Sequence, residues 1–408
     1  MKILVLSQYY WPENFRINEV AQTLNTKDVD VEILTGKPNY PAGEVFGGYN
    51  AMGCVQEVLK GLQVHRVPLF PRGKGGVRLA LNYLSFVLSA TVFGPRLLRG
   101  KQFDAILVFA PSPILQAIPA IFIGRLLKCP VLLWVQDLWP ESLSATGYVR
   151  NRWILRAVEY VVWWIYRRVD LLLVQSKAFT PKIQAMAGGT PVAYHPNSFV
   201  DHAIISGSRD VECPALDCSF PVLFAGNMGN AQAVEVVLEA ATILRDVKGI
   251  RFVMIGDGSR RGWLMQKAAE RGISNLVFPG RYPVETMSVL MKRAAVLLVT
   301  LADTEIFRLT VPSKVQAYLA AGRPIIACLN GVGAEIVQEA GAGVTVPAED
   351  ASALAQAVMT LYTLPEQERR EMGMRGRRYY EEHFSHEKLV DKLIEYLDQA
   401  IRRYKGIA

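Results

Sequence analysis

A lysine at the predicted start of a helix is the residue whose position points most directly to chemistry. Residues 311–314 read Val-Pro-Ser-Lys and precede a helix-forming run over 315–321. Pro312 suits the start of a helix because its missing N–H is not needed there, and Ser313 is expected to cap the helix. The unpaired amides of a first turn attract phosphate, whereas a positive charge there opposes the helix dipole. Lys314 is therefore best explained by an anion above the turn, the alternative being an ordinary solvated lysine.

Two acids that follow an apolar run are the candidate catalytic groups. Asp137 and Glu141 come after residues 131–134 and stand beside Trp139 and Pro140. A carboxylate against an apolar wall can be tuned to act as a base or to stabilise positive charge. In the alternative interpretation, Asp137 caps a short helix and Glu141 is the acid of its first turn.

Two glycine-containing loops follow strand-like runs in the second half of the chain. Gly226, Asn227 and Gly229 come after the first of these runs, and Gly256 lies within Ile-Gly-Asp-Gly after the next. Glycine lets the backbone approach a ligand closely, although each loop alone is equally well a tight turn. Arg281, after Phe-Pro-Gly, adds a planar cation suited to a base.

Apolar runs alternate with helical patterns along the chain, which is the order of a βα fold. The length of 408 residues predicts two domains, at 1–199 and 200–384, with a polar linker over 206–219. A helix is predicted over 385–404, and the C-terminal segment 385–408 that contains it is expected to pack back on the first domain. Each domain is expected to be a doubly wound, Rossmann-like α/β domain, with the ligand in the cleft between the carboxyl edges of the two sheets. The predicted strands are 3–7, 31–34, 105–109, 131–134, 171–174, 222–225, 252–255, 276–278, 296–299, 325–327 and 343–346.

Composition narrows the classes of partner. A net charge of +8 favours phosphorylated ligands or an acidic membrane surface. Nucleic acid is not expected, because the basic residues are dispersed. The five cysteines show no metal-ligand spacing and indicate a reduced cytosol. The one Asp-x-Asp sequence, at 28–30, is better explained as a turn than as a magnesium site, so no metal is expected.

Two segments of the first half combine apolar or aromatic residues with basic ones. Residues 77–98 are mostly apolar between flanking Arg and Lys residues, and residues 153–168 contain three Trp and two Tyr among arginines. Both compositions suit the headgroup layer of an anionic membrane. A core helix with a solvated basic face is the alternative for each, and polar residues make 77–98 less suited to span a bilayer.

The turn after the first strand argues against a dinucleotide oxidoreductase. It contains Glu13, Asn14 and Arg16 but lacks Gly-x-Gly-x-x-Gly. These three residues are expected at the cleft.

The combined motifs resemble a known family. Gly-Asn-Met-Gly at 226, Ile-Gly-Asp-Gly at 255, Phe-Pro-Gly-Arg at 278, Val-Pro-Ser-Lys at 311 and Ala-Gly-Arg-Pro at 321 are similar to the nucleotide-sugar half of GT-B glycosyltransferases of family 4. Tyr-Tyr-Trp-Pro-Glu-Asn at 9, Pro-Asn-Tyr-Pro at 38 and Gln-Asp-Leu-Trp-Pro-Glu at 136 look like the WbuB-type branch of bacterial surface-polysaccharide transferases, which carry N-acetyl-L-fucosamine.

The resemblance implies a function and a set of roles. The donor is a UDP-sugar, the acceptor is an undecaprenyl-diphosphate-linked saccharide, and the enzyme is peripheral on the cytoplasmic face of the bacterial inner membrane. Catalysis is retaining and needs no metal or other cofactor. By the same resemblance, Ser313 and Lys314 hold the donor diphosphate, and Gly226, Asn227 and Gly229 lie under the same phosphates. The cleft residues Glu13, Asn14 and Arg16 are expected on the acceptor side.

The chain departs from the family at three positions. Ala317 and Leu309 replace two glutamates, of which the second grips the ribose in relatives, and Gln136 replaces a histidine near the reacting sugar. Gln316 is the nearest alternative for the ribose. These losses keep open the interpretation as a catalytically inactive sugar-nucleotide-binding protein. A nucleotide-sugar epimerase, which shares the GT-B architecture, is a second alternative.

Overall fold

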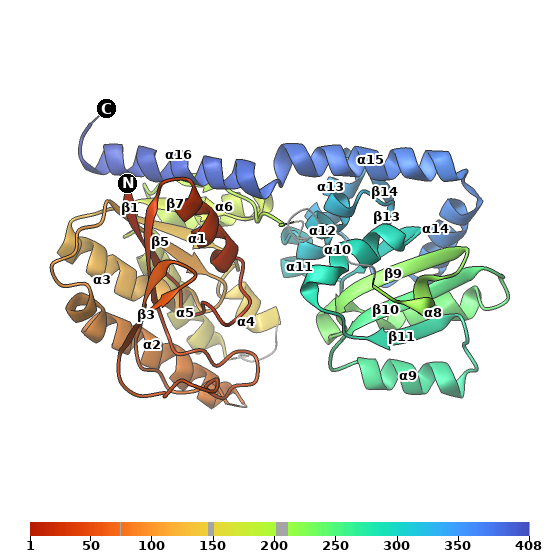
Figure 1. The fold of residues 1–408 in the computed structure, drawn as a ribbon, viewed down its shortest axis with the longest axis horizontal. Helices are drawn as coiled ribbons and strands as arrows, with labels where there is room; N and C mark the ends of the chain where they lie inside the picture. The colour runs from red at the N-terminus through yellow and green to blue at the C-terminus, as the bar shows by residue number, and fades with distance from the viewer. Residues whose placement is uncertain (74, 146–150, 201–210, 408) are drawn as a thin grey trace. The chain divides into compact units, whose positions relative to one another are not determined.

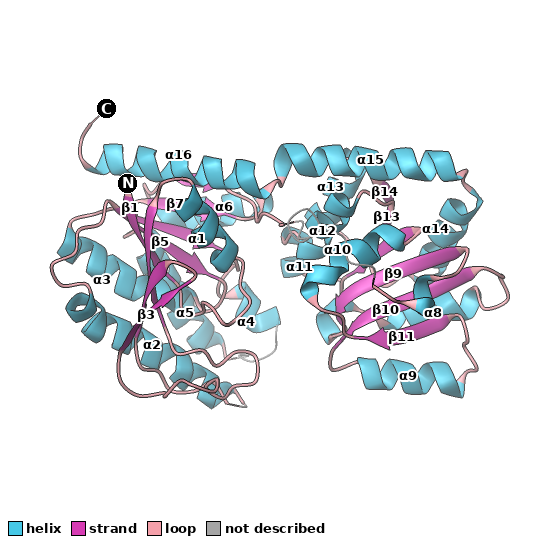
Figure 2. Ribbon diagram, in the orientation of Figure 1, coloured by secondary structure: helices cyan, strands magenta, loops and turns pink. Residues whose placement is uncertain are grey.

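The computed structural model describes residues 1–73, 75–145, 151–200 and 211–407 of the chain. The chain divides into two compact units (Figure 1). Unit 1 contains Met1–Pro196 and His386–Ala408, and unit 2 contains Asn197–Ser385. Each unit is a parallel sheet with helices packed against it (Figure 2), so both are Rossmann-like α/β domains, as the sequence predicted.

Unit 1 has an eight-stranded sheet in the order β3-β4-β2-β1-β5-β6-β7-β8, parallel except for β3. Helix α16 (His386–Tyr404) packs on this unit through Val390, Leu393 and Leu397. The strands are β1 (Lys2–Leu6), β2 (Asp30–Thr35), β3 (Val55–Leu59), β4 (Leu62–Arg66), β5 (Ala105–Ala110), β6 (Val131–Val135), β7 (Leu171–Val174) and β8 (Val192–Tyr194). The other α-helices are α1 (Ile17–Thr26), α2 (Gly76–Leu97), α3 (Ala117–Leu127), α4 (Glu141–Ala145), α5 (Arg152–Tyr166) and α6 (Thr180–Ala187).

Unit 2 has a six-stranded, wholly parallel sheet in the order β11-β10-β9-β12-β13-β14. Its strands are β9 (Phe220–Asn227), β10 (Ile250–Asp257), β11 (Leu276–Gly280), β12 (Val296–Thr300), β13 (Ile325–Cys328) and β14 (Gly343–Val346). Its α-helices are α8 (Glu235–Ile243), α9 (Arg261–Glu270), α10 (Val284–Arg293), α11 (Glu305–Leu309), α12 (Ser313–Ala321), α13 (Val332–Glu339), α14 (Ala351–Thr363) and α15 (Glu366–His383).

Alternation of apolar side chains explains why helices cover both faces of this sheet. Phe224 of β9 and Phe252 of β10 belong to one core cluster, which also contains residues of α8 and α14. Leu223 and Val253, the next residues on the same strands, belong to a second cluster with residues of α10 and α12. Successive side chains of a strand point to opposite faces, so strands that are apolar throughout need cover on both sides.

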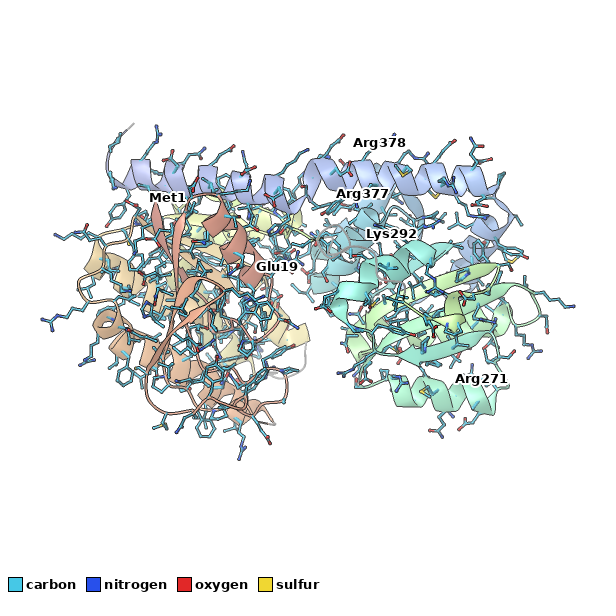
Figure 3. All side chains as sticks on the ribbon, viewed as in Figure 1. Met1, Glu19, Arg271, Lys292, Arg377 and Arg378 are labelled. Atoms are coloured by element: carbon cyan, nitrogen blue, oxygen red, sulfur yellow. The ribbon has the colours of Figure 1, made fainter. Side chains whose placement is uncertain are left out.

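Helix α12 is held in place at its C-terminal end. It begins at Ser313 and ends at Gly322, whose φ of +68° is the left-handed conformation that glycine adopts easily. Arg377 of α15, labelled in Figure 3, donates a hydrogen bond to the carbonyl of Ala320. The expectation that Ser313 caps the helix is wrong: the N-cap residue is Pro312 and no side chain makes the capping hydrogen bond.

The predicted strands all occur, with ends that shift by a few residues. The hairpin β3–β4 and the edge strand β8 were not predicted. The predicted linker falls partly at 206–210, outside the described residues, while 211–219 contains only a short 3₁₀ turn (Pro214–Leu216).

Candidate functional site

The carboxyl ends of β9 and β10 bring two of the predicted glycines side by side. The strands pair in register, with Gly226 opposite Gly256 and Asn227 opposite Asp257. A Cβ at Gly256 would overlap the carbonyl of Gly226, and Gly226 itself has φ +133°. Both positions therefore need glycine for backbone packing and conformation. Gly229 follows, where a Cβ would lie 2.9 Å from Nδ2 of Asn227.

Lys314 lies directly against this glycine loop. A Cβ at Gly226 would be 2.9 Å from its Cε and 3.6 Å from its Nζ. Its ammonium donates to Oε1 of Gln232 and lies 4.3 Å from the ring centroid of Phe224. Burial lowers the pKa of Lys314 to about 8. In the described part of the chain no carboxylate lies within ion-pair distance of Lys314, so a largely desolvated cation has only neutral partners.

Three residues of this cluster were not singled out from the sequence. Gln232 lies in a short 3₁₀ turn after Gly229, and Phe224 is an interior residue of β9. Tyr318 follows Lys314 by four positions on α12, and its hydroxyl accepts a hydrogen bond from the amide of Ala225 at 3.0 Å. The i,i+4 spacing was the available signal for Tyr318, because it places both side chains on one face of the helix. Tyr318 thereby ties α12 to the end of β9.

The cluster has the chemistry of an anion site. The first turn of α12 presents the amides of Ser313 and Lys314, which have no partner within the helix. These amides, the ammonium of Lys314 and the side-chain-free backbone at Gly226 converge at one edge of the sheet. A phosphate group placed there gains charge-assisted hydrogen bonds and the favourable end of the helix dipole.

Arg281 is engaged with an acid of the same edge. Its guanidinium lies 2.7 Å from Oδ2 of Asp257, and both side chains are well exposed. The amide of Gly258 also donates to Asp257, and together these contacts keep the pKa of Asp257 below its ordinary value. The structure therefore places Arg281 at the Gly256 loop, in an exposed ion pair.

Gln316, the residue suggested for ribose binding, makes a structural contact within unit 2. Gln316 is fully buried, and its Nε2 donates to the carbonyl of Asn197 at 2.7 Å. Its Nε2 amide hydrogen is therefore used to fix the segment that begins unit 2.

Asp137 in unit 1 follows β6, as the sequence predicted. Its carboxylate makes no hydrogen bond or ion pair with any residue that the structure describes, and burial raises its pKa to about 7. The neighbouring Leu138 and Trp139 are buried. The capping role is not seen, because α4 begins at Glu141 without a bond to the Asp137 side chain. A carboxylate in this setting can take up or release a proton near neutral pH.

Glu141 is the first residue of α4. Its carboxylate lies 3.4 Å from Nζ of Lys182 and is partly exposed. The two acids therefore differ: Glu141 has a cation beside it, whereas Asp137 is desolvated and unpaired.

Glu13 does not present its carboxylate to a ligand. Its side chain is 2% exposed and accepts hydrogen bonds from the amides of Asn39 (2.8 Å), Tyr40 (2.7 Å) and Tyr10 (3.4 Å). The expected acceptor contact is thus corrected: Glu13 ties the loop after β1 to the loop after β2. Asn14 is exposed, as expected for a contact residue. Arg16 precedes α1, and burial lowers the pKa of its guanidinium to about 10.

Residues in the described ranges contain no group of three or more His, Cys, Asp or Glu side chains placed to hold a metal ion. Two of the histidines are buried in structural settings. His65 contacts Glu32 at 2.7 Å, and His195 packs against Trp134 with ring centroids 4.7 Å apart.

Two family models match the chain. The one described as "Glycosyl transferase 4-like domain" matches residues 14–198, and the one described as "Glycosyl transferases group 1" matches residues 219–363. The first range contains every strand of the unit 1 sheet except β1, and the second contains all six strands of the unit 2 sheet.

The individual proteins that match this chain have low sequence identity to it. A protein described as probable glycosyltransferase WbjE of Pseudomonas aeruginosa is 26% identical over 298 residues, 71% of this chain and 74% of that protein. The protein described as colanic acid biosynthesis glycosyl transferase WcaI of Escherichia coli K12 is 24% identical over 349 residues, covering 79% and 82%. Among solved structures, Anabaena HepE in complex with UDP has a TM-score of 0.67 at 14% identity, with 98% and 100% of the two chains covered. The chain therefore carries two glycosyltransferase family domains, a glycosyl transferase 4-like domain in unit 1 and a group 1 domain in unit 2, and each has a Rossmann-like fold.

Proposed function

We propose that this chain transfers a sugar from a UDP-sugar to an undecaprenyl-diphosphate-linked saccharide during the synthesis of a bacterial surface polysaccharide. Relatives are described as acting in colanic acid synthesis and on an O-antigen chain, and the fold neighbour HepE binds UDP. The sugar proposed is an N-acetylated deoxyhexosamine such as N-acetyl-L-fucosamine, from the resemblance to the WbuB-type branch.

The observation that carries the proposal is the unpaired, desolvated ammonium of Lys314 against the glycine loop. A nucleotide diphosphate supplies the negative charge that this cluster lacks. The leaving group of a UDP-sugar gains charge as the bond between the anomeric carbon and the phosphate oxygen breaks. A fixed cation and fixed amides stabilise that developing charge without reorganisation.

The remaining steps are bond formation from the acceptor hydroxyl to the anomeric carbon and removal of the hydroxyl proton. In the retaining pathway that we propose, the proton passes to an oxygen of the leaving diphosphate. Asp137 stabilises the positive charge that develops on the sugar ring, which requires its ionised form. We further propose that no metal takes part, because Lys314 and the α12 amides already supply charge stabilisation.

The proposal is tested by incubating the protein with a panel of nucleotide sugars and a short prenyl-diphosphate-linked acceptor. We expect one UDP-N-acetyl-deoxyhexosamine to be turned over, with UDP and the glycosylated acceptor formed in equal amounts and with no loss when EDTA is added. Epimerisation of the donor without transfer would favour the epimerase, and binding without any turnover would favour the sugar-nucleotide-binding protein.

We also propose that unit 1 docks on the anionic cytoplasmic face of the membrane, where the lipid-linked acceptor lies. Helices α2 and α3 pack together, and α5 contacts α3. Exposed apolar residues follow helical spacing on α2 (Val77, Leu81, Leu84, Leu88, Val92), on α3 (Phe122, Leu126) and on α5 (Trp153, Ile154, Tyr160). Exposed arginines on the same helices include Arg96, Arg125 and Arg156.

Among the described residues, α2 is the one helix long and apolar enough to cross a bilayer. Asn82 on its buried face, however, accepts from Gln8 and donates to the carbonyl of Phe70, both at 2.7 Å. These buried bonds fix α2 to the sheet of unit 1. Its exposed stripe therefore suits the surface of a membrane better than its interior.

Replacing Arg96, Arg125 and Arg156 together with glutamine is expected to weaken binding to anionic vesicles about a hundredfold, since each basic residue near such a surface contributes about 1 kcal/mol. Co-sedimentation with phosphatidylglycerol vesicles measures this, and binding should fall as salt rises. The matched control replaces three exposed arginines of unit 2, at 245, 370 and 378. Equal binding by the two triple variants, or binding indifferent to lipid charge, would contradict the docking surface.

A further inference from the structure

Two basic side chains are completely buried where β2 and β4 end. The strands pair in parallel, with Thr35 opposite Arg66. Lys37 follows Thr35 by two positions, and both Lys37 and Arg66 have 0% exposed surface. Burying an ammonium or a guanidinium is costly unless acceptors or an opposite charge compensate.

Hydrogen bonds and an ion pair compensate in part for burying the charge of Arg66. Its Nε lies 2.5 Å from a carboxylate oxygen of Glu57, its Nη1 donates to the carbonyl of Gly36 at 3.1 Å, and its Nη2 donates to the carbonyl of Trp11. Glu57 also accepts from the hydroxyl of Tyr49. Three of the five N–H groups of Arg66 are used in this way, which leaves two for another acceptor.

The buried charge of Lys37 has no such compensation from hydrogen-bond acceptors. Its Nζ is buried and has no hydrogen-bond partner among the residues that the structure describes. The charged groups that affect it are Arg66, Glu57 and the thiol of Cys54. Arg66 also interacts with the carboxylate of Glu13, but burial raises the pKa of Glu13 to about 7, so this acid is only partly ionised at neutral pH. The two cations are therefore not fully balanced by Glu57 and Glu13, and an anion would complete the balance.

The buried cations Lys37 and Arg66 lie close to Cys54, which is exposed. Val55 pairs with Arg66 in the antiparallel β3–β4 ladder, so Cys54 stands immediately beside the pair and is exposed. The segment 43–54 folds back over the residues after β2, because the amides of Gly43 and Phe46 donate to the carbonyls of residues 39 and 38. The same segment contacts the pair itself, because the Tyr49 ring lies 4.8 Å from the guanidinium of Arg66. Entry of an anion to Lys37 and Arg66 therefore requires displacement of this segment.

We propose that Lys37 and Arg66 bind the diphosphate group of the acceptor at the carboxyl ends of β2 and β4. This assignment rests on the proposed function for the nature of the acceptor. The donor site described above lies in unit 2, at Lys314 and the two glycine loops, and we assign the phosphate site of unit 1 to the other substrate. Lys37 supplies a point charge and Arg66 its two remaining N–H donors.

Alkylation of Cys54 reports occupancy of this site without any need for activity. The full-length protein is treated with iodoacetamide, and modification of each cysteine is followed by mass spectrometry. Inorganic pyrophosphate at five times its dissociation constant should slow the modification of Cys54 about sixfold if the bound form is protected. Cys218 in unit 2, also accessible in part, is the internal reference and should be unaffected.

Lys37→Met tests the assignment of the ammonium. Methionine keeps the length of the side chain and removes the buried charge, so this variant should fold, and pyrophosphate should neither protect its Cys54 nor raise its melting temperature. Lys60→Met is the matched control, because Lys60 is an exposed lysine of the same unit. Equal protection in wild type and Lys37→Met, or no protection in wild type at any pyrophosphate concentration, would overturn the site.

Three further probes identify the source of the anion. Farnesyl diphosphate should protect Cys54 of the wild type, and farnesol should not. UDP should protect weakly or not at all, and protection by UDP equal to that by farnesyl diphosphate would overturn the assignment to the acceptor. Failure of the proposed glycosyl transfer appears instead in the donor panel, while farnesyl diphosphate would still protect Cys54, so the two failures are distinguishable.

Discussion

Lys314→Met should lower kcat about a hundredfold with saturating UDP-sugar, a loss of ~3 kcal/mol of transition-state stabilisation. Methionine keeps the apolar contact with Phe224 and loses only the ammonium that faces Gln232. The fold should survive, and the melting temperature should not fall, because the variant no longer buries a charge with neutral partners only.

Initial rates of UDP release and thermal melting, measured on the same preparations, check this expectation. Lys248→Met is the control, since Lys248 is an exposed lysine of the same unit. A Lys314→Met enzyme with nearly wild-type kcat would show that the residue serves only packing. A lost kcat together with a collapsed melting temperature would assign it to stability.

The sequence was sufficient to predict the strands of the two sheets apart from β3, β4 and β8. Continuous apolar runs such as 105–109 and 296–299 can be buried only in a parallel sheet covered on both faces. The hairpin β3–β4 escaped prediction because Val55–Leu59 reads Val-Gln-Glu-Val-Leu and is largely exposed, as an edge strand is. Short, half-polar strands of this kind carry too little periodicity to be recognised.

The candidate site was predictable where it depends on topology. Gly226, Gly256 and Lys314 each follow or flank strands of one parallel sheet, whose carboxyl ends share an edge, so their association follows from the order of elements. The ligand contact expected of Glu13 and the helix capping expected of Ser313 were wrong, because hydrogen bonds decide both. The amides that Glu13 binds are 26 and 27 residues away, in a loop whose return path no local pattern specifies.

The sequence also could not predict the burial and the raised pKa of Asp137. A carboxylate after a strand is common, and only the folded chain shows that no described cation approaches it and that burial raises its pKa to about 7. For a group that must be ionised, this value predicts that kcat/KM rises through about pH 7. Lys314, with a pKa of about 8, must be protonated, so kcat/KM should fall above that pH and the profile should be bell-shaped.

Asp137→Asn is expected to lower kcat much more than it weakens UDP binding, and to abolish the acidic limb of the profile. UDP affinity should be kept because Asp137 belongs to unit 1, whereas the proposed nucleotide site lies in unit 2. Glu141→Gln should retain the acidic limb, because the unpaired, desolvated group is Asp137. An Asn variant that keeps this limb would show that another group controls it.

The pH dependence of thermal stability tests Asp137 independently of activity. The folded-state pKa of Asp137, about 7, lies above its ordinary value of 3.8, so the folded state binds the proton more tightly than the unfolded state does. Its stabilising contribution is therefore full below about pH 4 and is lost as the pH rises through 7. Asparagine does not ionise, so the melting temperature of Asp137→Asn minus that of the wild type should grow from pH 5 to pH 8. A difference that stays constant over this range would mean that Asp137 ionises as freely in the folded chain as in the unfolded one, and would remove the physical basis for its role in catalysis.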